Sequence, residues 1–70
     1  MVIYVVTNGC IPCRAFRNIT NAEKFLDSQM FELCKLGHRI ETFKSREYVY
    51  SHPKEHTKHV LRIVETELQE

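Results

Sequence analysis

Two cysteines separated by two residues, Cys10 and Cys13 in the run Cys-Ile-Pro-Cys, are the residues of this sequence whose types and spacing most directly indicate chemistry. Thiolates at this spacing can converge on one metal ion, or the two sulfurs can bond to each other. A third cysteine, Cys34, makes the count odd, which is unusual for a secreted disulfide framework. In a reducing compartment a close pair more often indicates metal or redox chemistry. The sequence therefore predicts a cytoplasmic protein with chemistry at this pair.

The surroundings of the pair favour a redox interpretation. Residues 2–6 form an apolar run rich in β-branched and aromatic side chains, which predicts a buried strand, and residues 7–9 are a turn signal. The apolar spacing becomes helical from Ala15 onward, so we expect the pair at a helix N-terminus. Unpaired backbone N–H groups and the helix dipole stabilise a thiolate there. Cys10 is then the attacking sulfur, and Cys13, one turn further in, the resolving one.

A strand, then Cys-x-Pro-Cys-Arg, then a helix resembles the active-site segment of thioredoxins and glutaredoxins, over about residues 2–19. The resemblance implies dithiol–disulfide exchange, with Cys10 as nucleophile and Cys13 as resolving cysteine, and no cofactor. It also implies that the fold is an abbreviated form of the thioredoxin/glutaredoxin fold, in which the later hairpin and a C-terminal helix correspond to the closing half.

Zinc binding is the alternative use of the pair, because a structural zinc takes four Cys or His ligands. His52 and His56, spaced as His-x3-His, are one choice for the second pair of ligands, and Cys34 with His38 is the other. A bound zinc would stabilise a core that is small in a chain of 70 residues. This alternative is a zinc-stabilised module that binds a protein or nucleic-acid partner. A third interpretation is a plain interaction domain with incidental thiols.

One helix is predicted in the first half of the chain. Apolar residues recur at intervals of three and four along it, which predicts a helix over about residues 12–36 or, after a short turn, from residue 21. Gly37 is expected to end this helix in the left-handed conformation. Cys34 is beside the apolar stripe, so we expect a small buried core residue there.

The second half predicts a hairpin followed by a helix. Polar and apolar residues alternate over residues 39–44 and 47–50, with Ser45-Arg46 as a two-residue connection. Ser51 is a candidate N-cap of a second helix. That helix would bury the apolar residues Val60, Ile63, Val64 and Leu68. The sequence thus predicts one α+β domain over residues 1–70 with the order β-α-β-β-α.

Composition limits the partners. Ten Lys and Arg residues against nine Asp and Glu give a net charge of +1, which is not typical of a strong nucleic-acid binder. Residues 38–62 are locally basic, so a modest basic face is expected. No apolar run approaches the ~20 residues of a membrane span. A protein partner is therefore expected more than a nucleic acid, no membrane association is expected, and the small core allows a homodimer.

Overall fold

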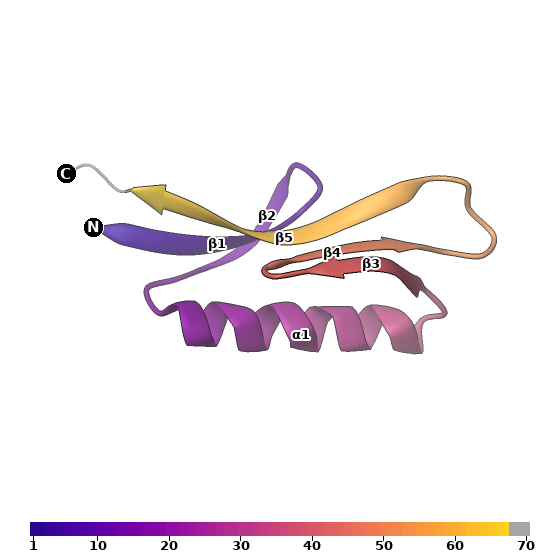
Figure 1. Cartoon of the computed structure of the whole chain (residues 1–70), viewed down its shortest axis with the longest axis horizontal. Helices are drawn as coiled ribbons and strands as arrows, with labels where there is room; N and C mark the ends of the chain where they lie inside the picture. The colour runs from indigo at the N-terminus through magenta and orange to yellow at the C-terminus, as the bar shows by residue number, and fades with distance from the viewer. Residues whose placement is uncertain (68–70) are drawn as a thin grey trace.

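The computed structural model of the protein describes residues 1–67. Within them, a five-stranded antiparallel sheet has the strand order β2-β1-β5-β4-β3, and helix α1 lies along one face (Figure 1). The elements are β1 (Val2–Asn8), β2 (Ile11–Phe16), α1 (Ile19–Lys35), β3 (Arg39–Lys44), β4 (Glu47–Ser51) and β5 (Lys58–Glu67). The α+β class is as expected from the sequence, but the element order is ββαβββ.

The Cys-Ile-Pro-Cys run lies in a β-hairpin and not at the start of a helix, which corrects the expectation from the sequence. Asn8 pairs with Ile11 across a two-residue turn, and Gly9 at its first position has a φ of 62°. A type II′ turn requires a positive φ at that position, and glycine adopts it without strain. β2 is an edge strand, and Pro12 borders the register shift in its pairing with β1; edge strands and bulges are the places in a sheet that tolerate proline.

Helix α1 begins at Ile19, which lies between the two predicted starts at residues 12 and 21. Asn18 caps it, since its side-chain oxygen accepts a hydrogen bond from the N–H of Thr20 at 2.7 Å. At the other end the N–H of Gly37 donates to Cys34 O and the N–H of His38 donates to Leu33 O, both at 3.1 Å. These two bonds form a Schellman motif, so the predicted left-handed end at Gly37, with a φ of 97°, is confirmed.

The hairpin of β3 and β4 is confirmed, with Lys44 paired to Glu47 across Ser45 and Arg46. Arg46 has a φ of 67°, which is unfavourable for a residue with a side chain. Its carbonyl accepts a hydrogen bond of 2.9 Å from the N–H of Ile63. This bond ties the turn to β5 and helps to hold the backbone in place.

The predicted C-terminal helix is wrong, because residues 58–67 form strand β5. The whole of β1 pairs with residues 61–67 of β5, from Val2 opposite Glu67 to Asn8 opposite Leu61. Leu61 and Ile63 are buried beneath α1, while Arg62 between them is exposed, as the period of two in a strand requires. The predicted helix position Leu68 lies outside the described residues.

The core lies between α1 and the sheet. Its buried members are Val6, Ala22, Leu26, Met30, Tyr50, Leu61 and Ile63. The helix packs chiefly on β1, β5 and β2, and therefore leaves the β3 side of the sheet less covered. Tyrosines contribute to this core, since Tyr50 is 3% exposed and Tyr4 and Tyr48 pack against the buried cluster.

The two glycines give a matched stability test. An added Cβ at Gly37 would lie 3.2 Å from His52 Nε2, whereas an added Cβ at Gly9 meets no atom within 4 Å. We expect Gly9→Ala to lower the free energy of unfolding by about 1 kcal/mol through its positive φ alone. Gly37→Ala should lower it more, measured by urea denaturation. Adding His52→Ala should recover part of the Gly37→Ala loss but none of the Gly9→Ala loss; equal losses for both glycines would contradict the close approach of His52.

Candidate functional site

The structure separates Cys10 and Cys13 from the helix that was expected to activate them. Both are exposed, Cys10 in the turn and Cys13 in β2, whereas α1 begins only after Asn18. Arg14 does not extend over the pair either, because its guanidinium lies 5.4 Å from the centre of the Phe16 ring, on the side of the sheet that faces α1. The two cysteines are thus exposed and close in sequence, but no helix N-terminus lies beside them to stabilise a thiolate.

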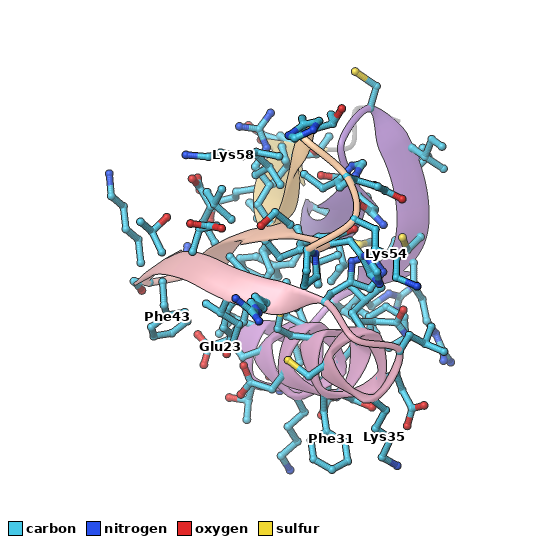
Figure 2. The ribbon with its side chains drawn as sticks, turned by 90° about the vertical axis from the view of Figure 1, so that its right-hand side faces the viewer. Glu23, Phe31, Lys35, Phe43, Lys54 and Lys58 are labelled. Carbon is cyan, nitrogen blue, oxygen red and sulfur yellow. The ribbon has the colours of Figure 1, made fainter. Side chains whose placement is uncertain are left out.

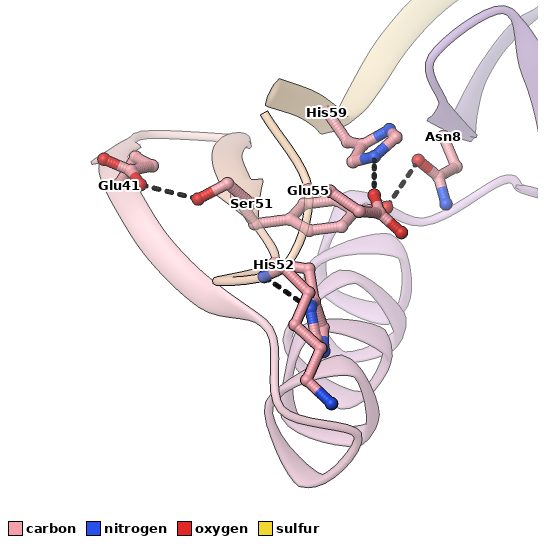
Figure 3. Close-up of polar contacts among 8 residues, drawn as sticks. Asn8, Glu41, Ser51, His52, Glu55 and His59 are labelled. Carbon is pink, nitrogen blue, oxygen red and sulfur yellow. Dashed lines mark hydrogen bonds and ion pairs between the residues drawn. The ribbon is translucent and has the colours of Figure 1, made fainter. Parts of the chain in front are cut away.

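The alternative zinc ligands are not gathered into one cluster. Within residues 1–67, no group of three or more His, Cys, Asp or Glu side chains is arranged to hold a metal ion. His52 Nδ1 accepts a hydrogen bond from the N–H of Lys54 at 3.1 Å (Figure 3). His56 is exposed in the loop before β5. Cys34 is exposed and not a core residue, which corrects the expectation from the sequence, because it lies beside the buried helix positions and not among them.

Three histidines, His38, His52 and His59, pack at the end of the sheet near the turn that connects α1 to β3. The ring of His38 lies 5.1 Å from that of His52 and 5.3 Å from that of Tyr50, and Tyr50 also stacks on His59 at 5.3 Å. The Tyr50 hydroxyl donates to Asn8 Oδ1 at 2.8 Å. This packing connects the α1–β3 turn to the β4–β5 loop, so these histidines have a structural role that their spacing in the sequence does not reveal.

β3 is an edge strand with its outer side open. All six of its residues are exposed, including Ile40 at 47% and Phe43 at 60%. An edge strand presents unpaired N–H and C=O groups to which another chain can add. The register with β4 shifts between Ile40 and Thr42, so the regular part of β3 is residues 42–44.

A small pocket lies between α1 and the β3–β4 hairpin. Its volume is about 120 Å³, and it is lined by Glu23, Leu26, Asp27, Phe43, Ser45 and Arg46. Viewed along the helix, Phe43 and Glu23 lie on the same side of the molecule, away from Lys54 and Lys58 (Figure 2). The Tyr48 hydroxyl donates to Asp27 Oδ1 at 2.7 Å, and the Tyr48 ring lies 4.5 Å from that of Phe43. The pocket lining therefore combines two carboxylates with the ring of Phe43, and Tyr48 contacts both Asp27 and Phe43.

The electrostatics of the pocket favour a positive charge. Burial, the hydrogen bond to Asp27 and the nearby charges of Asp27 and Cys34 together raise the pKa of Tyr48 to about 12. Within the described residues, the carboxylate of Glu23 makes neither a hydrogen bond nor an ion pair. The guanidinium of Arg46 lies 6.0 Å from the Tyr4 ring and forms no ion pair with Glu23 or Asp27. Two carboxylates thus line the pocket without a paired cation.

The face of the sheet opposite α1 carries most of the predicted basic stretch. Arg39, Lys44, Lys58 and Arg62 share it, because their paired neighbours alternate with the residues buried under the helix. No aromatic side chain of β3, β4 or β5 lies on this face. Single-stranded nucleic acids are bound by stacking their bases on aromatic rings. The basic face therefore lacks the feature that would favour nucleic acid as its ligand.

Comparisons of the chain with protein-family models, with curated proteins and with solved structures found no match. In the part of the chain that the structure describes, no helix combines the length and apolar character needed to cross a membrane. The assignment of a function to this protein therefore depends on its own residues.

The hydrogen bond between Tyr48 and Asp27 has a spectroscopic test. The raised pKa means that Tyr48 stabilises the folded state below pH 10, and that this contribution is lost as the pH rises from 10 to about 12. We expect the phenolate absorbance of the folded protein to include a step near pH 12 that belongs to Tyr48, above the ordinary tyrosine pKa of 10.0. Tyr48→Phe should remove this late step, and Asp27→Asn should move it to lower pH. The absence of a late step that Tyr48→Phe removes would contradict the hydrogen bond between Tyr48 and Asp27.

Proposed function

We propose that this protein is a binding module that receives an extended segment of a partner protein as an added strand on the free edge of β3. The observation that carries the proposal is the pocket beside this edge, between β3 and α1. Strand addition obtains affinity from main-chain hydrogen bonds and specificity from pockets that take alternate side chains. Residues 42–44 of β3 supply the main-chain hydrogen-bonding groups, and α1 supplies one wall of the pocket.

The two edges of the sheet differ in their capacity to accept a strand. β2 carries Pro12, which has no N–H to donate to an added strand. β3 contains no proline, and its regular part ends at the turn that borders the pocket. These differences favour β3 as the receiving edge.

The size of the pocket supports a side chain as its occupant. Sites for small molecules and cofactors typically have volumes of roughly 300–1,000 Å³. A volume of about 120 Å³ is smaller, but it has room for the end of one side chain. A residue added directly opposite Phe43 would lie about 5 Å from it on the same face. Its side chain would then reach the mouth of the pocket.

Selection of peptides from a random display library tests this function. We expect selected peptides to shift the amide NMR signals of residues 42–44 and not those of β2. Methylating alternate backbone nitrogens of a selected peptide should abolish its binding, because the methyl groups replace main-chain donors. Binding that survives methylation in both possible phases, or signals that move on the basic face alone, would contradict strand addition at β3.

Thiol–disulfide exchange is a second candidate, in the cytoplasmic setting that the sequence predicts. It is supported by the exposure of both Cys10 and Cys13, which are separated by two residues on one hairpin. In such an exchange the Cys10 thiolate attacks a substrate disulfide and releases one substrate thiolate. The Cys13 thiolate then attacks the mixed disulfide. The protein gains an intramolecular disulfide, and the substrate gains two electrons and two protons as a pair of thiols.

The intact native mass of freshly purified protein tests the thiols. Exchange predicts a mass lower by two hydrogens that a reductant restores, and faster labelling of Cys10 than of Cys13. Cys34→Ser should leave both results unchanged and serves as the control. Slow and equal labelling of Cys10 and Cys13 would contradict exchange.

The zinc alternative instead predicts a mass raised by that of one zinc ion, and the added mass should disappear on acidification. The same raised mass in a variant with His52→Ala and His56→Ala would exclude these two histidines as the ligands.

A further inference from the structure

We infer that the pocket between α1 and the β3–β4 hairpin takes a lysine or arginine side chain of the bound segment. This inference rests on the proposed strand addition at β3 and specifies the chemistry of the partner. The pocket is lined by two carboxylates, the Phe43 ring and the Arg46 side chain.

The carboxylates come from adjacent turns of the helix. Glu23 and Asp27 are four residues apart in α1, so they lie on the same face of the helix, and both line the pocket. The Glu23 carboxylate has no hydrogen-bond or ion-pair partner among the described residues. The Asp27 carboxylate accepts a hydrogen bond from Tyr48 at one oxygen, Oδ1. A cation between them would therefore gain two attractive charges without displacing an existing ion pair.

The aromatic rings provide the second component of cation recognition. Phe43 lines the pocket, remains 60% exposed, and its ring is tilted by 37° against that of Tyr48. A cation within about 6 Å of such a ring is attracted by the negative charge of its π face. The hydroxyl of Tyr48 also holds the Asp27 carboxylate in place. A neutral or acidic side chain would gain none of the charge attraction, and an acidic one would be repelled.

The arginine of the pocket wall does not satisfy this site. Arg46 belongs to the hairpin turn, and its guanidinium lies at 6.0 Å from the Tyr4 ring. It forms no ion pair within 4.0 Å with either carboxylate. Two carboxylates and one guanidinium give the pocket lining a net negative charge, and neither carboxylate is held in an ion pair by the arginine.

A peptide series tests the inference. The position of a β3-binding peptide that faces Phe43 is made lysine, arginine, norleucine or glutamate in turn, and the dissociation constants are measured by calorimetry. We expect lysine and arginine to bind roughly five- to tenfold more tightly than norleucine, and glutamate to bind most weakly. Raising the salt concentration should narrow these differences.

Variants of the protein supply the matched control. Glu23→Gln should weaken the lysine peptide about threefold or more and leave the norleucine peptide unchanged. Glu32→Gln is the control, because Glu32 is an exposed carboxylate of the same helix that pairs with Lys35 at 3.6 Å and does not line the pocket. It should change neither affinity.

The outcomes separate the inference from the proposed function. Equal affinities for lysine, norleucine and glutamate, with NMR shifts still at residues 42–44, would overturn the cation pocket and leave strand addition intact. A lysine preference that Glu23→Gln and Asp27→Asn do not reduce would also overturn it. Failure of every peptide to bind at β3 would overturn both.

Discussion

The pairing of β1 with β5 brings together segments from opposite ends of the described chain, and the other elements are arranged around this pair. Its register runs from Val2 opposite Glu67 to Asn8 opposite Leu61, and it contributes Val6, Leu61 and Ile63 to the core. Without β5, β1 would expose one edge and β4 would lose its inner neighbour. The hairpins β1–β2 and β3–β4 form locally, but the sheet that joins them depends on this distant contact.

This central pair also determines where the candidate site lies. With β1 and β5 inside, β2 and β3 become the two edges of the sheet. The chain between these edges must cross the sheet, and α1 is the crossing. α1 therefore packs over β2, β1 and β5 and reaches the β3–β4 hairpin with Glu23 and Asp27 on its flank. An open edge and a charged pocket become neighbours as a result of this topology.

Local signals in the sequence predicted local structure well. The alternation of residues 39–44 and 47–50 gave the hairpin, and Gly37 gave the helix end, because both patterns depend on neighbours in the chain. The spacing of Val60, Ile63 and Val64 fits a helix, yet these residues form a strand. β1 pairs with Ile63 and Val64, and β4 pairs with Val60. The start of the helix was misplaced because β2 also depends on pairing with β1.

The candidate pocket could not be predicted for a related reason. Glu23 and Asp27 read as the solvated face of a helix, and Phe43 as one apolar residue of an alternating strand. Nothing in their spacing indicates that they line the same cavity. The cysteine pair is recognisable in the sequence because its spacing is local. Its position in the hairpin shows that a short motif does not specify the secondary structure that carries it.

The place of β5 in the sheet has a consequence for synthesis on the ribosome. A central strand normally forms early in a hairpin-by-hairpin assembly, but here residues 58–67 are the last described strand to be translated. Until they leave the exit tunnel, β1 and β4 each lack a neighbour, and the apolar side of α1 has an incomplete surface to cover. The nascent chain therefore carries two loosely associated hairpins, and the sheet closes in one late step, as the final strand inserts between them.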